Sequence, residues 1–306
     1  MQFLVNAKFD FVGKRNTAIM VSVALIVIGL GSLIIHKGPN YGIDFLGGTS
    51  IELSFEKPVS VADIRKVVAS AGYANAEVKS FGADTEILIR VEQQESGTEI
   101  SDAIKASISG AFAENPYTVQ LVEKVGPKIG AELREAALLA VLLALLLILL
   151  YVSWRFEFIF AIGAIVALFH DVLITIGVFS VLNLEISLAI IAAFLTIVGY
   201  SLNDTIVVFD RIRENLKVLR RETYETIVNS SINESLTRTL VTSLTTLFVV
   251  TILYFFGGEV IHNFAFALIV GVVVGTYSSI FIASPIVVEW EKRREQKKGR
   301  PLPKRA

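Results

Sequence analysis

The sequence predicts a polytopic α-helical membrane protein with six transmembrane helices and a small ferredoxin-like α+β domain on the extracytoplasmic side. The first observation is composition, because 53% of the 306 residues are apolar and the mean hydropathy is +0.63. The second is length, since six apolar runs approach the about 20 residues that a helix needs to cross a bilayer. The third is charge, since short loops that carry Lys or Arg alternate with short loops that carry none.

The first span is expected at residues 17–35, after a cytoplasmic N-terminus at residues 1–16. Lys14 and Arg15 precede it as in a signal peptide, but the run is longer than a usual signal and ends without a small-residue cleavage site. We therefore expect an uncleaved helix. The other spans are expected at residues 136–152, 158–181, 186–209, 240–256 and 264–288.

Loop charges predict the orientation. Arg155 lies between the second and third spans, several basic residues lie in the connection 210–239, and others crowd the tail 289–306. The turns 182–185 and 257–262 contain no Lys or Arg. Because basic residues favour the cytoplasmic side, both termini are expected in the cytoplasm.

The long first loop, residues 36–135, is large enough to fold as a domain of its own. Period-two runs predict strands at 49–55, 77–81, 86–91 and 117–125, and amphipathic runs predict helices at 61–71, behind Ser60 as N-cap, and 100–113. The order βαββαβ is that of a ferredoxin-like sandwich, a scaffold that names no function. Nothing in it groups a nucleophile with a base, so no catalytic residue is assigned.

The cytoplasmic connection contains an amphipathic segment at residues 222–236, whose apolar residues recur at helical spacing. It is expected to lie along the membrane interface. A short soluble connecting helix is the alternative, and the sequence does not separate the two.

Ionisable residues inside the predicted spans indicate a function beyond anchoring, because an Asp or Arg near the bilayer centre costs about 2.5–3.5 kcal/mol on insertion scales. Asp204 lies at least one turn inside the fourth span, and Arg238 marks the cytoplasmic end of the fifth. These helices run in opposite directions, so the two side chains are expected at similar depth, where they can form an ion pair. A membrane carboxylate balanced by a movable arginine is the usual arrangement of a proton relay.

The alternative for this pair is an interhelical contact that only fixes helix packing, with Arg238 extending to the aqueous interface. His170 and Asp171 form a second polar site in the third span. Adjacent helical residues point about 100° apart, and we favour a satisfied interior hydrogen-bond network for them. Gly271 and Gly275 have the GxxxG spacing of close helix packing.

Composition excludes several classes of function. The chain has no cysteine, which removes disulfides, thiolate metal sites and thiol catalysis. The net charge of -1 hides a basic tail and a mildly acidic first loop, a distribution that indicates a topology signal and not a nucleic-acid groove. No cofactor and no metal are expected.

Four motifs carry a resemblance to a known family. They are GIDFLGG at 42–48, VGYSLNDTIVVFDRIRE at 198–214, SLTRTLVTSLTTL at 235–247 and GTYSSIFIASP at 275–285. With them the chain resembles, over essentially its whole length, the SecF subunits of bacterial SecDF protein-export complexes in the resistance-nodulation-division superfamily. The middle two motifs are the most specific.

The resemblance implies a non-enzymatic subunit of the bacterial inner membrane that, with SecD, uses the proton-motive force to assist SecYEG-dependent preprotein export. It places the proton relay on Asp204 and Arg238. The expected supporting polar path comprises Asn203, Thr205, Thr242, Thr245 and Asp171, and the expected structural motif comprises Gly42, Asp44, Gly47 and Gly48. The implied partners are SecD, the SecYEG translocon, YajC or YidC, unfolded preprotein, protons and the lipid bilayer, with no nucleic acid.

Two other functions compete with this one. A small-molecule exporter of the same superfamily generally has larger outer domains and a second six-span half in the same chain. A scaffold for the translocon would use its buried charges for packing alone, and Asp204→Asn separates it from a proton-driven subunit.

Overall fold

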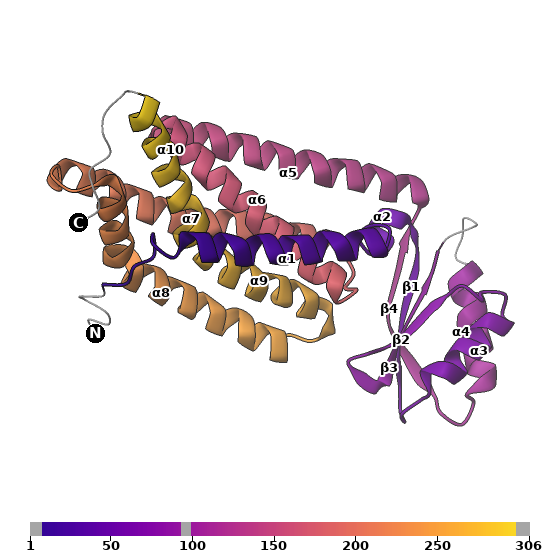
Figure 1. The fold of residues 1–306 in the computed structure, drawn as a ribbon. Helices are drawn as coiled ribbons and strands as arrows, with labels where there is room; N and C mark the ends of the chain where they lie inside the picture. The colour runs from indigo at the N-terminus through magenta and orange to yellow at the C-terminus, as the bar shows by residue number, and fades with distance from the viewer. Residues whose placement is uncertain (1–7, 93–98, 298–306) are drawn as a thin grey trace.

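The computed structural model describes residues 8–92 and 99–297, which form an elongated helical bundle with an α+β domain at one end (Figure 1). Six segments of the described chain are long and apolar enough to cross a membrane. The first five are α1 (Arg15–Ile35), α5 (Pro127–Arg155), α6 (Phe158–Val181), α7 (Leu188–Val218) and α8 (Tyr224–Phe256). The sixth joins α9 (Glu259–Ser278), a π-helical turn (Ser279–Ala283) and α10 (Ser284–Lys297).

The α+β domain contains β1 (Gly48–Phe55), α3 (Val61–Ser70), β2 (Glu77–Phe81), β3 (Ala83–Val91), α4 (Glu99–Ala111) and β4 (Tyr117–Val125). The strands form one antiparallel sheet in the order β2-β3-β1-β4. Alternate residues of β1 and β3, such as Ile51 and Ile89, are buried with Ile64 of α3 and Ile104 of α4. Ser60 is the N-cap residue of α3, but its side chain makes no capping hydrogen bond.

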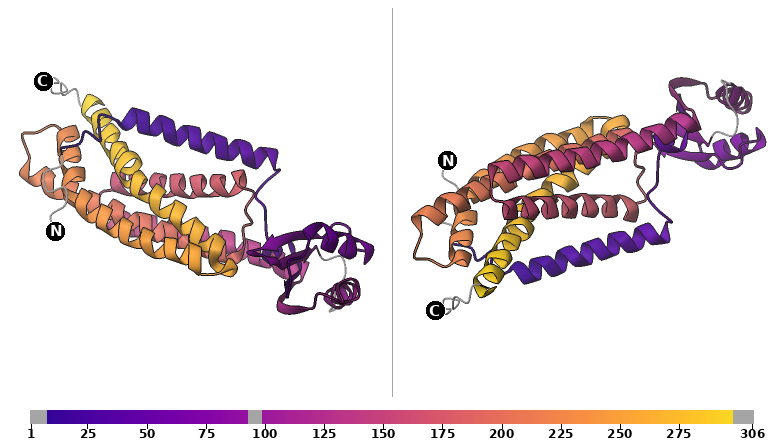
Figure 2. Two further views of the ribbon diagram at one scale, coloured as in Figure 1. Left: turned by 90° about the horizontal axis from the view of Figure 1, so that it is seen from below. Right: turned by 90° about the horizontal axis from the view of Figure 1, so that it is seen from above.

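This order and connectivity are those of a ferredoxin-like sandwich, with both helices on one face of the sheet. Together with the six candidate spans, the domain confirms the predicted fold class. The two ends of the described chain are close to the same end of the bundle. Figure 2 shows that α1 begins and α10 finishes at the end away from the α+β domain. Residues 1–7 and 298–306, which include part of the predicted basic tail, lie outside the described residues.

The predicted amphipathic segment is continuous with the fifth span, because α8 runs from Tyr224 to Phe256 without a break. Its apolar residues Val228 and Ile232 are buried in the main cluster of the bundle. Asn229 and Asn233 also bind the backbone of Phe9, with amide-to-carbonyl distances of 2.9 Å. This part of α8 therefore packs against the segment that leads into α1.

The π turn in the sixth span has a local cause. Pro285 has no backbone N–H, and its ring clashes with the carbonyl one turn earlier in a regular helix. The wider turn relieves this clash, and the hydroxyl of Ser284 donates to the carbonyl of Ser279 at 2.8 Å. As a result α10 continues the sixth span towards the end of the bundle away from the sheet.

Candidate proton path in the helical bundle

Asp204 is buried in the helical bundle, with 1% of its surface exposed. The hydroxyl of Ser243 on α8 donates to Asp204 Oδ2 at 3.2 Å. Thr276 Oγ1 on α9 lies 2.7 Å from Ser243 Oγ and 2.7 Å from the carbonyl oxygen of Val272, and either atom can accept its one proton. This short chain of hydroxyl groups joins α7, α8 and α9 at the carboxyl group.

Small residues of α9 allow the helices to approach closely beside this site. A Cβ atom at Gly271 would lie 2.2 Å from the side chain of Ile197, and one at Gly275 would lie 3.0 Å from Ser201 Cβ. Neither position has room for a larger residue. The GxxxG spacing therefore packs α9 directly on α7, as predicted, and brings Thr276 within reach of Ser243.

Arg238 lies on α8, with its side chain exposed at the surface of this single chain. Among the described residues no ion pair joins it to Asp204. The hydroxyls of Thr242 and Thr245 bind carbonyls of their own helix, at 2.7 Å to Arg238 O and 2.9 Å to Val241 O. Among the described residues, Arg238, Thr242 and Thr245 therefore lie on α8 without a side-chain hydrogen bond or ion pair to Asp204.

Buried hydroxyl groups without a partner gather on α7 and α8. Within the described chain, Thr205 Oγ1, Thr239 Oγ1 and Tyr200 Oη are inaccessible to solvent and make no hydrogen bond. Most buried polar groups in folded proteins are paired, so unpaired ones need an explanation. Asn203, by contrast, is exposed. The part of α7 around Asp204 thus contains spare hydrogen-bonding capacity.

Asp171 occupies a second polar cluster, which is fully bonded. Its Oδ2 accepts hydrogen bonds from Ser201 of α7 at 2.6 Å and from Ser278 of α9 at 2.8 Å. Its Oδ1 lies 2.9 Å from Nδ1 of His170. Asp171 is completely buried, and side chains from α6, α7 and α9 meet at its carboxylate.

His170 extends this cluster towards α1. Its Nε2 lies 2.9 Å from Ser22 Oγ, which is 3.0 Å from the hydroxyl of Tyr277. Tyr277 donates that hydroxyl to the carbonyl of Ala18 at 2.6 Å. The two adjacent residues of α6 therefore face different helices while bonding to each other, which confirms the predicted interior network.

The Gly42–Gly48 motif lies where the α+β domain joins the bundle. Asp44 Oδ2 accepts the backbone N–H of Leu188 at 2.8 Å. That N–H belongs to the first turn of α7, where donors have no partner within the helix. Gly42 N–H donates to the carbonyl of Ile186 at 2.9 Å. The motif thus contacts the start of the helix that contains Asp204.

The glycine pair at the end of this motif meets the start of α5. A Cβ atom at Gly47 would lie 2.8 Å from the backbone of Pro127, and one at Gly48 would lie 2.6 Å from the carbonyl of Val91. Both glycines also have positive φ angles, 76° and 148°, which favour glycine over other residues. A turn between strand and bundle therefore requires glycine at both positions.

Sequence reasoning missed Ser243, Thr276, Ser201, Ser278 and Ser22. Serine and threonine are common in membrane helices, where they often bond to their own backbone, so residue type alone does not mark them. The only sequence signal for them was helical spacing, since residues three or four apart lie on one helix face. Ser201 lies one turn before Asp204, and Ser243 lies one turn after Thr239. Among the described residues no group of three metal-ligating side chains could hold a metal ion.

Comparison with known proteins identifies relatives over nearly the full chain. The family "Protein export membrane protein SecD/SecF, C-terminal" matches residues 105–293, and the "SecD/SecF GG Motif" matches residues 32–59. The protein translocase subunit SecF of Thermodesulfovibrio yellowstonii is 46% identical over 292 residues, which cover 94% of this chain and 96% of the relative. The corresponding subunit of Magnetococcus marinus is 49% identical over 290 residues, covering 94% and 93%.

Two solved structures share the fold. The crystal structure of SecDF from Thermus thermophilus, a translocon-associated membrane protein, matches with a TM-score of 0.87 and 43% identity over 95% of this chain. SecDF in its super-membrane-facing form matches with a TM-score of 0.72 and 41% identity over 97% of this chain. The chain spans 40% of the length of each of these structures.

Proposed function

The chain belongs to the SecD/SecF family as a SecF subunit, and we propose that, with SecD, it uses the proton-motive force to assist SecYEG-dependent preprotein export. The observation that carries this proposal is the buried carboxyl group of Asp204, which has a single side-chain hydrogen bond in the described structure, from Ser243. A buried acid with free acceptor positions can gain or lose a proton without breaking a network. Intramembrane acids of this kind mark proton relays.

The second member of the proposed relay is Arg238. Its exposed side chain shares the surface of α8 with Thr245 and with large apolar residues such as Val249. A charged group on a lipid-facing surface is unfavourable, so this surface is expected to contact protein in the assembly. SecD is the proposed occupant, because two six-span halves form the working unit in transporters built from repeats.

Proton movement would change the charge balance between these helices. A protonated Asp204 attracts Arg238 less, and α7 and α8 can then shift relative to each other. Each charge moved across 100 mV supplies about 2.3 kcal/mol, enough to change a two-state population substantially. Thr205 and Thr239, with unpaired buried hydroxyls, would offer hydrogen-bonding positions along the path. The proposed path would also be lined by Asn203 on α7 and by Thr242 and Thr245 on α8. Asp171 would support the path indirectly, by fixing α6 against α7 and α9.

The proposed orientation follows from the loop charges. The end of the bundle with Arg155, Arg211 and Arg213 lies in the cytoplasm, together with both termini, and the α+β domain lies outside. The proposed location is the bacterial inner membrane. The emerging preprotein, the SecYEG channel and YajC or YidC would then meet a complex whose outer domains move with the proton cycle.

The test measures proton flux and preprotein export by the assembled SecD–SecF complex in proteoliposomes with SecYEG. Asp204→Asn removes a titratable group without changing size, and Arg238→Met removes its counter-charge. We expect at least about a tenfold loss of proton-driven export in each, equivalent to about 1.4 kcal/mol in the barrier. Asp210→Asn is the matched control, since Asp210 is on the same helix but pairs with Arg155 at 3.1 Å near the end of the bundle.

The outcome also separates a scaffold from a proton-driven subunit. A scaffold requires only that the complex assembles, so Asp204→Asn should then export at the rate of the Asp210→Asn control. Normal proton flux and export in both Asp204→Asn and Arg238→Met complexes would overturn the proposal.

A further inference from the structure

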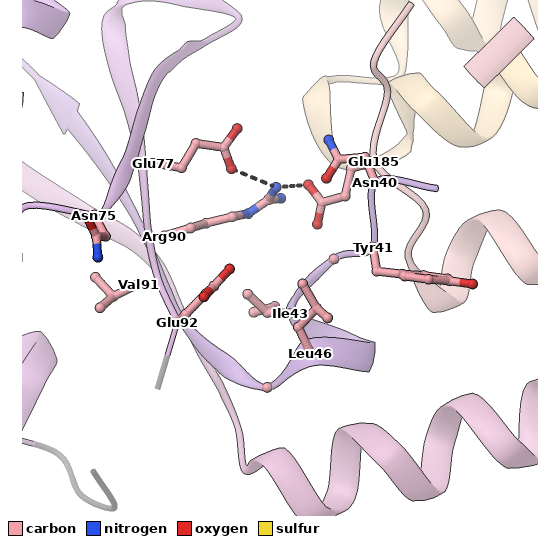
Figure 3. Close-up of a pocket in the computed structure, with 12 residues that line it drawn as sticks. Asn40, Tyr41, Ile43, Leu46, Asn75, Glu77, Arg90, Val91, Glu92 and Glu185 are labelled. Atoms are coloured by element: carbon pink, nitrogen blue, oxygen red, sulfur yellow. Dashed lines mark ion pairs between the residues drawn. The ribbon is translucent and has the colours of Figure 1, made fainter. Parts of the chain in front are cut away.

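Four charged side chains meet where the α+β domain rests on the helical bundle. Glu77 and Lys79 are on β2, Arg90 is on β3, and Glu185 is in the turn between α6 and α7. Figure 3 shows the guanidinium group of Arg90 between the carboxylates of Glu77 and Glu185. Arg90 and Glu185 form a close ion pair in which the Glu185 side chain is only 10% exposed. A contact of this kind fixes the domain against the bundle.

The three groups of the sheet lie on one face because of strand register. Glu77 is directly opposite Arg90 in the antiparallel pair of β2 and β3. Lys79 lies two residues further along β2, and residues two apart on a strand share a face. Glu185 therefore faces two cationic side chains, Lys79 and Arg90, from neighbouring strands.

Each carboxylate lies within reach of both cations. Arg90 Nη1 is 3.7 Å from Glu77 Oε2, and Lys79 Nζ is 3.2 Å from Glu77 Oε1. Lys79 Nζ is also 4.0 Å from Glu185 Oε2. Two pairings are consequently available, Arg90–Glu185 with Lys79–Glu77, or Lys79–Glu185 with Arg90–Glu77.

We propose that these four residues form a two-position latch, in which Glu185 exchanges Arg90 for Lys79 as the α+β domain tilts on the bundle. Removing one partner from a buried ion pair is strongly unfavourable because it leaves a charge uncompensated. Here every charge keeps an opposite partner in both pairings. Neither pairing leaves a charge uncompensated, which is what a bistable element requires.

Burial makes the exchange at Arg90 easier. Desolvation lowers the pKa of Arg90 below its ordinary value, whereas the nearby carboxylates of Glu77, Glu123, Glu52 and Asp44 act in the opposite direction. The guanidinium group therefore gives up hydration to reach Glu185. A less buried position beside Glu77 restores some of that hydration and offsets the lost contact.

The position of Glu185 connects this latch to α7. Glu185 is three residues before Leu188, the first residue of α7, whose N–H is bound by Asp44 at 2.8 Å. Ile186 N–H donates to the carbonyl of Asn40 at 2.7 Å, and Gly42 N–H donates back to the carbonyl of Ile186 at 2.9 Å. Hydrogen bonds to the backbone thus join the α+β domain to the start of α7, the helix that contains Asp204, and this junction can act as a hinge.

The space around this hinge supports the proposal. A cleft lined by Asn40, Tyr41, Asn75 and Glu92 adjoins the latch (Figure 3). A Cβ atom at Gly42 would lie 2.2 Å from Glu185 Oε1, so only glycine at this position allows the carboxylate to lie where it meets Arg90. Lys79 is the diagonal neighbour of Arg90 on the paired strands, and such neighbours are about 7–8 Å apart, so a tilt of this order would bring Lys79 to the present place of Arg90.

The test is a distance measurement on the intact SecD–SecF complex in lipid bilayers. The chain has no cysteine, so Ala106→Cys on α4 and Leu182→Cys at the end of α6 can each accept one nitroxide label when SecD is also made cysteine-free. Pulsed electron paramagnetic resonance then reports the distance between the domain and the bundle. This measurement needs no proton gradient, so its result is independent of whether Asp204 transfers protons.

Arg90→Gln leaves Lys79 as the partner of Glu185, and Lys79→Gln leaves Arg90. We expect the two variants to give distance distributions whose centres differ by up to about 7–8 Å, and the parent complex to contain both. Arg90→Lys keeps the charge and should retain both distances. Lys66→Gln is the matched control, because Lys66 pairs with Asp63 on α3 at 3.0 Å and should leave the parent distribution unchanged. Coinciding distributions for Arg90→Gln and Lys79→Gln would overturn the latch.

Discussion

Two aspartates in the same bundle are equally buried but differ in their hydrogen bonding. Asp171 on α6 is bonded by Ser201 and Ser278 and lies beside Nδ1 of His170. Asp204 on α7 accepts a single side-chain bond in the described structure, at 3.2 Å. Burial alone therefore does not distinguish a structural acid from a functional one.

The difference lies in what a proton would disturb. A fully bonded network in a low-dielectric interior is stabilising only while every member is satisfied. Protonating Asp171 places a hydrogen where a donor already points, whereas Asp204 has free acceptor positions. We infer that Asp171 fixes helices in place and that Asp204 is free to exchange a proton. The predictions below test this contrast.

The largest expected effect is on stability. Asp171→Ala leaves Ser201, Ser278 and His170 without their shared partner, and we expect it to lower the free energy of unfolding by about 3–5 kcal/mol. Asp204→Ala removes one long hydrogen bond and should cost no more than about 2 kcal/mol. Reversible unfolding in mixed micelles measures both. Equal losses would contradict the division into a structural and an exchanging carboxyl group.

A smaller pair of substitutions tests the same contrast without touching either acid. Ser201→Ala removes a 2.6 Å bond to Asp171, and we expect a stability loss of about 1–3 kcal/mol. Ser243→Ala removes the 3.2 Å bond to Asp204 and should cost less than about 1 kcal/mol in stability. Because Ser243 touches the proposed relay, its variant should instead slow proton-driven export about two- to fivefold, up to about 1 kcal/mol in the barrier.

Export and unfolding must be measured on the same preparations. The contrast predicts that Ser243→Ala impairs export more than stability and that Ser201→Ala does the reverse. Ser107→Ala is a suitable control, since its hydroxyl bonds to the carbonyl of Ala103 on the surface of the α+β domain. If both bundle variants lose export only in proportion to stability, Asp204 has no special role.

The topology was predictable because its signals are local or simple. Apolar length predicts the spans, alternation predicts the strands, and the βαββαβ order predicts the sheet arrangement. The buried network of His170 and Asp171 was also predictable, because two polar side chains in the middle of an apolar helix must find partners. These inferences need no knowledge of how one helix is rotated against another.

The contacts of Asp204 depend on that rotation. Sequence depth along antiparallel helices predicted a meeting with Arg238, but depth does not determine which face of α8 points inwards. Hydroxyl groups lie on both faces of α8, Ser243 and Thr239 on the buried one and Thr242 and Thr245 towards the surface. The polarity of these residues therefore does not indicate which face of α8 lies beside Asp204. In the described structure Ser243 occupies the position beside Asp204.

The latch was unpredictable for a related reason. Arg90 and Glu185 are far apart in the chain, Arg90 in a predicted strand and Glu185 in a short turn between two predicted spans, and neither segment indicates a charged partner. Their contact exists because the α+β domain docks on the turn before α7. Docking of this kind depends on the shapes of two folded units and leaves no local pattern in the sequence.

The smallest expected effect extends the contrast between satisfied and unsatisfied acids to the sheet. Glu52 on β1 lies on the face away from the helices, and burial together with the nearby carboxylate of Glu123 raises its pKa, although Arg90 acts in the opposite direction. A raised pKa in the folded state means that folding favours the protonated acid. Stability is then greatest below the ordinary glutamate pKa, about 4.3, and falls as the pH rises through the folded-state pKa.

Glu52→Gln removes this titration. We expect the variant to stabilise the α+β domain at pH 7 by less than about 1 kcal/mol, because solvent screens a partly exposed charge. Below about pH 4 the parent residue is protonated in both states, and the difference should vanish. Hydrogen exchange of the strand amides in the whole chain, measured at both pH values, tests this. Asp84→Asn, at an exposed position of β3, controls for the loss of a surface charge. A destabilised Glu52→Gln domain at pH 7 would mean that the carboxylate is well paired in the folded sheet, as Glu185 is.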